Sequence, residues 1–282
     1  MNSKIGTVSH SFHRGLVFVL LSLVLAATPL RAVDEQLHFL PAGKPDVVAL
    51  LAPPPLPDSP EQAADLAEVQ AVFHAAFSND VAVAFSEKKF SIFNFTPAVG
   101  MFFQSNNLPK IATFFHQVQT DAEIVTDNAK DYYKRPRPFT VDPRLASGQL
   151  EKSFSYPSGH STESMVLALV LTDLFPDKQD AIITEARAIG WHRVEIARHY
   201  QTDIYAGRVL AQAIVREMKA SPDFQRDFAE AKAEVAAAQK NQVSEQEKVL
   251  AIWADAKPPR LTRILNSASA GVPPAIDLVV GQ

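Results

Sequence analysis

Between Ser158 and Phe175 the chain is apolar on nearly every side, which leaves few places for this segment in a folded protein. Its middle reads MVLALVL, about two helical turns without a polar face. A helix that is hydrophobic all round is buried among other elements. The sequence therefore predicts one central helix that other helices surround.

Helical spacing of apolar residues recurs along the chain, whereas strand-type alternation is scarce. Ser59, followed by Pro60 and Glu61, predicts the start of one helix. The R-P-R-P run at residues 135–138 must end another, because proline removes a backbone donor and disfavours helix before it. Further helices are expected over residues 108–133, 180–198, 203–219 and 221–239. We predict an all-α protein with a single helical-bundle domain over residues 61–240.

The first 32 residues have the pattern of a secretory signal. Lys4 and Arg14 precede an apolar run of 12 residues, Leu16–Ala27, which is too short to span a bilayer. Cleavage after Ala27 or Ala32 would suit this pattern, and an uncleaved membrane anchor is the alternative. The prediction is a periplasmic or secreted protein.

Two other segments fall outside the predicted bundle. Residues 33–60 contain Pro53, Pro54, Pro55 and Pro57, which predicts an extended proline-rich N-terminal arm on the domain surface. Residues 241–282 form a C-terminal extension that we expect to be partly disordered. No segment after the signal is long and apolar enough to suggest a membrane span.

The charge of the chain limits its partners. Loss of residues 1–32 removes three of the 27 basic residues and none of the 31 acidic ones, which leaves 24 basic residues and a net charge of −7. Such a surface does not favour nucleic acid or anionic lipid. Any anion site must therefore be a local cluster of cations. The chain has no cysteine, so packing rather than disulfides must stabilise it.

A first cluster of cations lies at the predicted helix end. Residues 130–137 contain four basic side chains, of which Lys130 can act as a point charge and Arg137 as a planar fork for phosphate oxygens. The alternative is a set of solvated charges that complement the helix dipole.

A second cluster, Tyr156–His160, enters the predicted buried helix. Ser158 and Gly159 would present backbone amides to an anion at the helix N-terminus, where the dipole assists binding. Gly159 has no side chain to block a close approach. His160 would then stand beside the bound group as a proton donor. The alternative is a helix cap with an incidental histidine.

A third cluster runs from His192 to Asp203. Arg193 adds a phosphate-binding cation, and Thr202 has the pattern of an N-cap for the following helix. Asp203 follows His199 by four positions, so its carboxylate can fix one ring nitrogen and leave the other free to attack. A buried His–Asp pair that only braces two helices is the alternative.

Together the three clusters resemble the signature of the type 2 phosphatidic acid phosphatase superfamily: K-x6-R-P, P-S-G-H and S-R-x5-H-x3-D. The matching residues are Lys130, Arg137 and Pro138; Pro157, Ser158, Gly159 and His160; and Arg193, His199 and Asp203. More narrowly, the chain resembles the bacterial class A non-specific acid phosphatases over residues 50–235. It departs from the family at His192, where the family has serine.

The resemblance implies an exported, metal-independent acid phosphatase that hydrolyses small phosphorylated substrates, without a cofactor, as a homo-oligomer. Lys130, Arg137, Arg193, Ser158 and Gly159 would hold the phosphoryl oxygens. His199, oriented by Asp203, would attack and form a phosphohistidine, and His160 would protonate the leaving alcohol.

Two other functions fit the same motifs. A vanadate-dependent haloperoxidase uses a similar anion pocket, and a non-catalytic periplasmic phosphate-binding protein would keep the pocket without turnover. No spacing of His, Cys or Asp suggests a zinc site. His74 and His116 lie on apolar helices and are expected in the core rather than at a ligand.

Overall fold

The computed structural model describes residues 36–255, and within them the chain forms helices joined by loops, with no strand. The α-helices are α1 (Val47–Leu50), α2 (Pro60–Ala75), α3 (Ser78–Ser86), α4 (Thr96–Val99), α5 (Pro109–Tyr133), α6 (Pro138–Val141), α7 (Gly159–Leu174), α8 (Gln179–Glu195), α9 (Gln201–Lys219) and α10 (Pro222–Asp255). Short 3-10 helices are η1 (Ile92–Phe95), η2 (Pro143–Leu145) and η3 (Pro176–Lys178). The all-α prediction is confirmed. The predicted signal, residues 1–32, lies outside the described residues.

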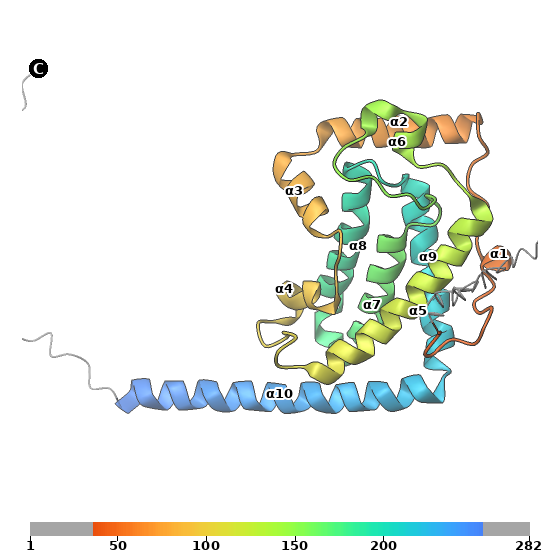
Figure 1. The fold of residues 1–282 in the computed structure, drawn as a ribbon. Helices are drawn as coiled ribbons and strands as arrows, with labels where there is room; N and C mark the ends of the chain where they lie inside the picture. Colours follow the sequence, from red (N-terminus) through yellow and green to blue (C-terminus); the bar gives the residue numbers. More distant parts are fainter. Residues whose placement is uncertain (1–35, 256–282) are drawn as a thin grey trace, which may run out of the picture. The chain divides into compact units, whose positions relative to one another are not determined.

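Helix α7 is the centre of the bundle. It packs against α5, α8 and α9, which surround it in Figure 1. Val166, Leu167 and Leu171 have no exposed surface. Burying an aliphatic side chain of this size contributes about 1.5–3 kcal/mol. The prediction of a central buried helix is therefore confirmed.

Helix α10 packs along the N-terminal half of α5. Leu108 gives α5 no side-chain cap, and the Glu234 carboxylate accepts instead from the amides of Lys110 (3.0 Å) and Ile111 (2.8 Å). A carboxylate at a helix N-terminus also complements the helix dipole. The prediction that this helix ends near Gln239 is wrong, because α10 continues to Asp255. None of the helices within residues 36–255 is long and apolar enough to cross a bilayer.

The proline-rich arm is described from residue 36 onward. The Asp121 carboxylate in α5, which is fully buried, accepts from the three amides of residues 38–40 at 2.7–3.0 Å. The hydroxyls of Tyr133 and Tyr156 donate to the carbonyls of Leu51 (3.0 Å) and Ala52 (2.5 Å). A buried carboxylate without such donors would be costly. These contacts hold the arm on the bundle at residues 38–40 and again at Leu51 and Ala52.

Three helix ends position the site. Helix α5 stops at Tyr133 before the left-handed Lys134, as the R-P-R-P run predicted. Helix α7 starts after its N-cap Ser158, and Gly207 in α9 lets the two helices approach closely there. Helix α8 ends at Glu195, and Ala197 with φ of 54° turns the chain back toward α9. His74 and His116 are exposed, so their predicted place in the core is wrong.

Candidate active site

His199 lies in the turn between α8 and α9 and is 3% exposed. Its Nδ1 is 3.4 Å from Asp203 Oδ2, and its Nε2 is 3.2 Å from Arg137 Nη1. A guanidinium has only donors, so Nε2 must accept and the ring proton belongs on Nδ1, toward Asp203. The contacts of His199 therefore select one neutral tautomer, whose Nε2 lone pair faces the cations.

The electrostatics agree with a neutral ring. Burial, assisted by Arg137, Lys130 and Arg193, lowers the pKa of His199 well below its ordinary value. These four effects favour the uncharged imidazole. A neutral imidazole is the form that can act as a nucleophile.

Asp203 is itself held by several donors. Its carboxylate accepts from Arg135 Nη1 (2.5 Å), the Ser155 hydroxyl (2.6 Å) and the Tyr200 amide (2.9 Å). Burial raises the pKa of Asp203, and these donors act in the opposite direction. Because its position is fixed from three sides, Asp203 can fix the His199 ring in turn.

Tyr200, rather than Thr202, is the N-cap of α9. The predicted cap is wrong because the Thr202 hydroxyl is used in tertiary contacts: it donates to Asp65 and accepts from Arg135 at 2.7 Å. Asp203 at the third helical position reaches back to the Tyr200 amide instead. Asp203, which faces His199, thus also stabilises the first turn of α9.

His160 lies in the first turn of α7. Its Nε2 is 3.1 Å from the Glu87 carbonyl oxygen, and its ring centroid is 5.4 Å from that of Phe90. Burial lowers the pKa of His160 well below its ordinary value, and Arg193 and His199 add to this effect. Gly159, the residue before His160, lies beside Lys130, so His160 starts α7 next to this lysine.

Lys130 lies over the start of α7. A Cβ placed on Gly159 would be 3.2 Å from Lys130 Nζ and 3.2 Å from Glu163 Oε1, so a larger residue here would push these side-chain ends aside by a few tenths of an ångström. Lys130 also pairs with Asp127 at 2.7 Å. The Lys130 ammonium group therefore lies beside the start of α7. Glu163, the other neighbour of Gly159, has its pKa raised to about 7 by burial.

The helix start offers fewer amides than expected. The Ser158 amide donates to the Asp203 carbonyl at 3.1 Å, so the predicted use of this amide for phosphate is wrong. The Ser158 hydroxyl accepts from the Ser161 amide at 3.4 Å as the cap of α7. The amides of Gly159 and His160 stand in the first turn, where the helix supplies no acceptor.

Arg137 and Arg193 are buried and already engaged. Arg137 donates to the Ser153 carbonyl (2.7 Å) and the Arg198 carbonyl (2.9 Å) in addition to His199. Arg193 pairs with Glu151 at 2.7 Å, and Glu151 is also 2.7 Å from Arg198. These partners fix both guanidinium groups in place. Glu151 places one carboxylate between two buried guanidinium groups, those of Arg193 and Arg198.

Direct contacts link His199 to Arg137 and Asp203, Ser158 to Asp203, and the Gly159 position to Lys130. The Arg193 carbonyl accepts from the His199 amide at 3.3 Å, and His160 follows Gly159 in the first turn of α7. The chemical roles of these residues stay predictions. Within residues 36–255, no group of three or more His, Cys, Asp or Glu side chains is arranged to hold a metal ion.

Known proteins resemble this chain over the helices that carry the site. Residues 118–226 match the PAP2 superfamily. A non-specific acid phosphatase of Providencia stuartii is 32% identical over 148 residues, which is 50% of this chain and 60% of that protein. An acid phosphatase of Zymomonas mobilis is 28% identical over 199 residues, 67% of this chain and 75% of that protein. Over these residues the chain is therefore similar to the PAP2 superfamily.

Among solved structures, a transmembrane PAP2-type phosphatidylglycerolphosphate phosphatase from Bacillus subtilis matches with 24% identity and a TM-score of 0.43, over 62% of this chain and 89% of that one. The chain matches 60% of the length of the Providencia relative.

The PAP2 signature did not reveal several residues that complete the site. Glu151, Ser155 and Arg135 hold Arg193 and Asp203, and Glu87 contacts His160. Only Arg135 stood in a recognised cluster, as one of four neighbouring cations. His192, which stands in place of the family serine, bonds through Nδ1 to Glu87 Oε2 at 2.8 Å.

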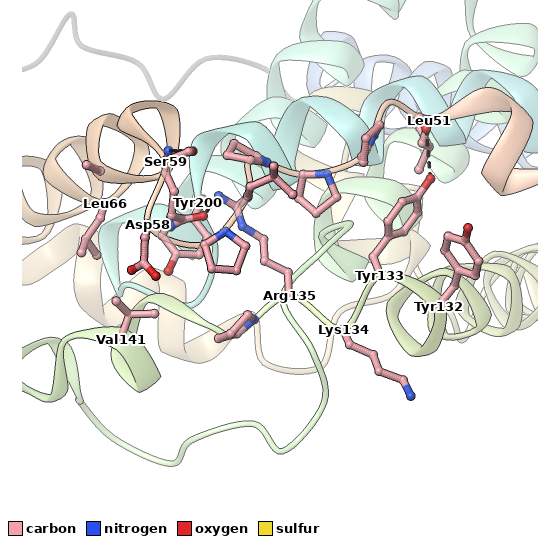
Figure 2. Close-up of a pocket in the computed structure, with 18 of the residues that line it drawn as sticks. Leu51, Asp58, Ser59, Leu66, Tyr132, Tyr133, Lys134, Arg135, Val141 and Tyr200 are labelled. Carbon is pink, nitrogen blue, oxygen red and sulfur yellow. Dashed lines mark hydrogen bonds between the residues drawn. The ribbon is translucent and has the colours of Figure 1, made fainter.

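A cavity of about 960 Å³ lies between the proline-rich arm, the start of α2 and the end of α5 (Figure 2). Arg135 and Tyr200 belong to its lining, and the Arg135 guanidinium stacks 3.9 Å from the centroid of the Tyr200 ring. Neither His160, His199 nor any of the expected phosphate ligands lines it. This cavity therefore adjoins the candidate site through Arg135 and is distinct from it.

Proposed function

We propose that this protein is a member of the PAP2 superfamily and an acid phosphatase that hydrolyses small phosphomonoesters through a phosphohistidine on His199. One observation carries the proposal: Arg137 donates toward Nε2 of His199 while Asp203 faces Nδ1. This arrangement directs a neutral, oriented imidazole at a cluster of cations. The names of the relatives support the same reaction class.

The cations supply the binding energy for a phosphate dianion. Lys130, Arg137 and Arg193 would donate to the non-bridging oxygens, with the first-turn amides of α7. An incoming oxygen would take over the Arg137 donor that now meets Nε2, which frees the lone pair of His199. Fixed donors around a transferring phosphoryl group stabilise its charge in the transition state without reorganisation.

The chemistry then takes two steps. Nε2 of His199 attacks phosphorus, an N–P bond forms, and the P–O bond to the alcohol breaks as His160 gives its proton to the leaving oxygen. In the second step His160 accepts a proton from water, the new hydroxide attacks phosphorus, and the N–P bond breaks to release inorganic phosphate. Each histidine ends in its starting state.

This scheme requires a protonated His160. Burial and neighbouring cations lower the pKa of His160. A bound dianion brings opposite charge beside the ring and raises that pKa. Substrate binding thus recruits the proton that the leaving group needs, which favours catalysis on the acidic side of neutrality.

The proposal extends to three features that the motifs imply. We propose that residues 1–32 direct export to the periplasm or outside the cell, that turnover needs no metal or other cofactor, and that the protein forms a homo-oligomer. Lys130 and the arginines would supply the positive charge that a metal supplies in other phosphatases.

Hydrolysis of p-nitrophenyl phosphate by the exported protein tests the function. We expect that ~10 mM EDTA, a large excess over trace metal, does not remove the activity. We also expect that His199→Ala abolishes it. His116→Ala, which changes an exposed histidine on α5, is the matched control and should retain activity. Acid-labile phosphate on the quenched wild-type protein, absent from His199→Ala, would identify the intermediate.

Other outcomes select the alternatives. Full loss of activity in EDTA, reversed by a divalent ion, would overturn the metal-free mechanism. Halide oxidation with vanadate and peroxide would indicate a haloperoxidase, and phosphate binding without turnover would indicate a binding protein.

A further inference from the structure

His192 and Glu87 form a partly buried pair behind the site. His192 lies in the last turn of α8, and Glu87 caps the C-terminal end of α3. Nδ1 of His192 is 2.8 Å from Oε2 of Glu87, across 105 residues of sequence. The Glu87 side chain is 7% exposed and that of His192 is 18% exposed. Such a charge-assisted contact fixes the end of α3 on α8.

The same segment touches His160. The Glu87 carbonyl oxygen is 3.1 Å from Nε2 of His160, and the Phe90 ring packs against the imidazole. A carbonyl only accepts, so Nε2 of His160 carries a hydrogen, and Nδ1 is the ring nitrogen left for proton transfer. The Glu87 carbonyl therefore sets the tautomer of the His160 ring, and this carbonyl and the Phe90 ring together set its orientation.

Charges around the pair favour a protonated His192. The hydrogen bond to Glu87 raises the pKa of His192, and Glu195 and Glu185 on α8 add to this effect against burial. Burial raises the pKa of Glu185, and the negative charge of Glu87 adds to this effect. Without a cation at residue 192, the Glu87 carboxylate would be held inward beside other acids. The Glu87 side chain would then turn toward solvent, and residues 87–90 would be held less firmly.

We propose that Glu87 and His192 are positioning residues that hold residues 87–90 against His160 and so keep this histidine aligned as the general acid. This inference rests on the proposed phosphatase function. It also gives the histidine at position 192 a role that a serine cannot fill, because the serine hydroxyl carries no charge.

The dependence on leaving group separates positioning of an acid from general support of the fold. Nitrophenolate leaves without much help from a proton, whereas the alkoxide of glycerol 2-phosphate needs one. A misplaced His160 therefore slows the alkyl substrate selectively. Because general acid catalysis contributes about 10²–10⁴-fold, partial misalignment should cost about tenfold or more in kcat/KM for glycerol 2-phosphate and less than about threefold for p-nitrophenyl phosphate.

The variants are Glu87→Gln and His192→Ser, each measured on both substrates, with urea unfolding to verify the fold. The two variants change opposite sides of the Glu87–His192 contact. If one of them fails to fold, the other still tests the inference. Glu185→Gln is the matched control: it removes an acid that faces His192 but does not carry the segment at His160, and it should keep the wild-type ratio between the substrates.

Each outcome has one meaning. A selective loss on glycerol 2-phosphate in a folded variant supports the inference. An equal loss on both substrates, or no loss, overturns it while the proposed function stands. A wild-type protein that hydrolyses neither substrate instead refutes the proposed function itself.

Discussion

Gly207→Ala should weaken the protein at the contact that builds the candidate site. A Cβ at residue 207 would lie 2.9 Å from the Ser158 carbonyl oxygen, 3.0 Å from Thr162 Oγ1 and 3.1 Å from Ser161 Cβ. Ordinary van der Waals contact starts near 3.4 Å. The first turn of α7 and the neighbouring turn of α9 must therefore separate by about half an ångström.

Two effects of opposite sign set the magnitude. Overpacking of a tight interface costs about 1–3 kcal/mol, and alanine in a helix is about 1 kcal/mol better than glycine. At residue 207 the crowded atom is a backbone carbonyl that cannot rotate away, so the cost lies in the upper part of its range. The net loss of unfolding free energy should be about 1–2 kcal/mol.

Gly190→Ala provides the graded comparison. Its Cβ would meet only the Ser161 side chain, at 3.2 and 3.3 Å, and then Ile204 at 3.5 Å. Here the smaller steric cost and the gain in helix propensity should nearly cancel, to within about 0.5 kcal/mol. Urea unfolding of both variants measures the difference, and KM for p-nitrophenyl phosphate should rise for Gly207→Ala alone. Equal stability of the two variants would refute the steric argument.

Two further predictions concern His199. Asp203→Asn should lower kcat on the order of 10³-fold with little change in KM, because an amide no longer selects the Nδ1–H tautomer of His199; steady-state kinetics measure this, and a loss confined to KM would contradict it. The second concerns stability against pH: the pKa of His199 is depressed in the fold, so below pH of about 6.5 the unfolded chain takes up a proton that the native state does not. Unfolding free energy should thus fall with decreasing pH, by up to about 1.4 kcal/mol per pH unit, and His199→Gln should show a shallower fall in phosphate-free urea unfolding.

The helices could be predicted where their signals are local. Ser59 accepts from the Gln62 amide at 3.1 Å and starts α2 as expected, and Ser158 starts α7. The end of α10 was missed although its signal was present: residues 240–255 contain neither glycine nor proline, and nothing in them stops a helix rich in good helix formers. The predicted helix end at residue 239 was wrong because the polar composition of the residues that follow does not by itself stop a helix.

Thr202 illustrates the opposite case, in which tertiary contacts override a local preference. Threonine is a favoured N-cap, but its hydroxyl is drawn to Asp65 in α2 and to Arg135 after α5. Neither partner lies near it in the sequence. A residue that can serve either a helix end or a buried ion network takes the second role when the network would otherwise lack a partner.

The motif residues were visible because their spacing within each motif is fixed, whereas the residues that hold them were not. Glu151 reaches Arg193 across 42 residues, Ser155 reaches Asp203 across 48, and Glu87 reaches His192 across 105. Burial of several guanidinium groups requires carboxylates and carbonyls beside them, since an unpaired buried charge is too costly. The sequence thus demands that some of its 31 acidic residues turn inward, but only the path of the chain decides which ones do.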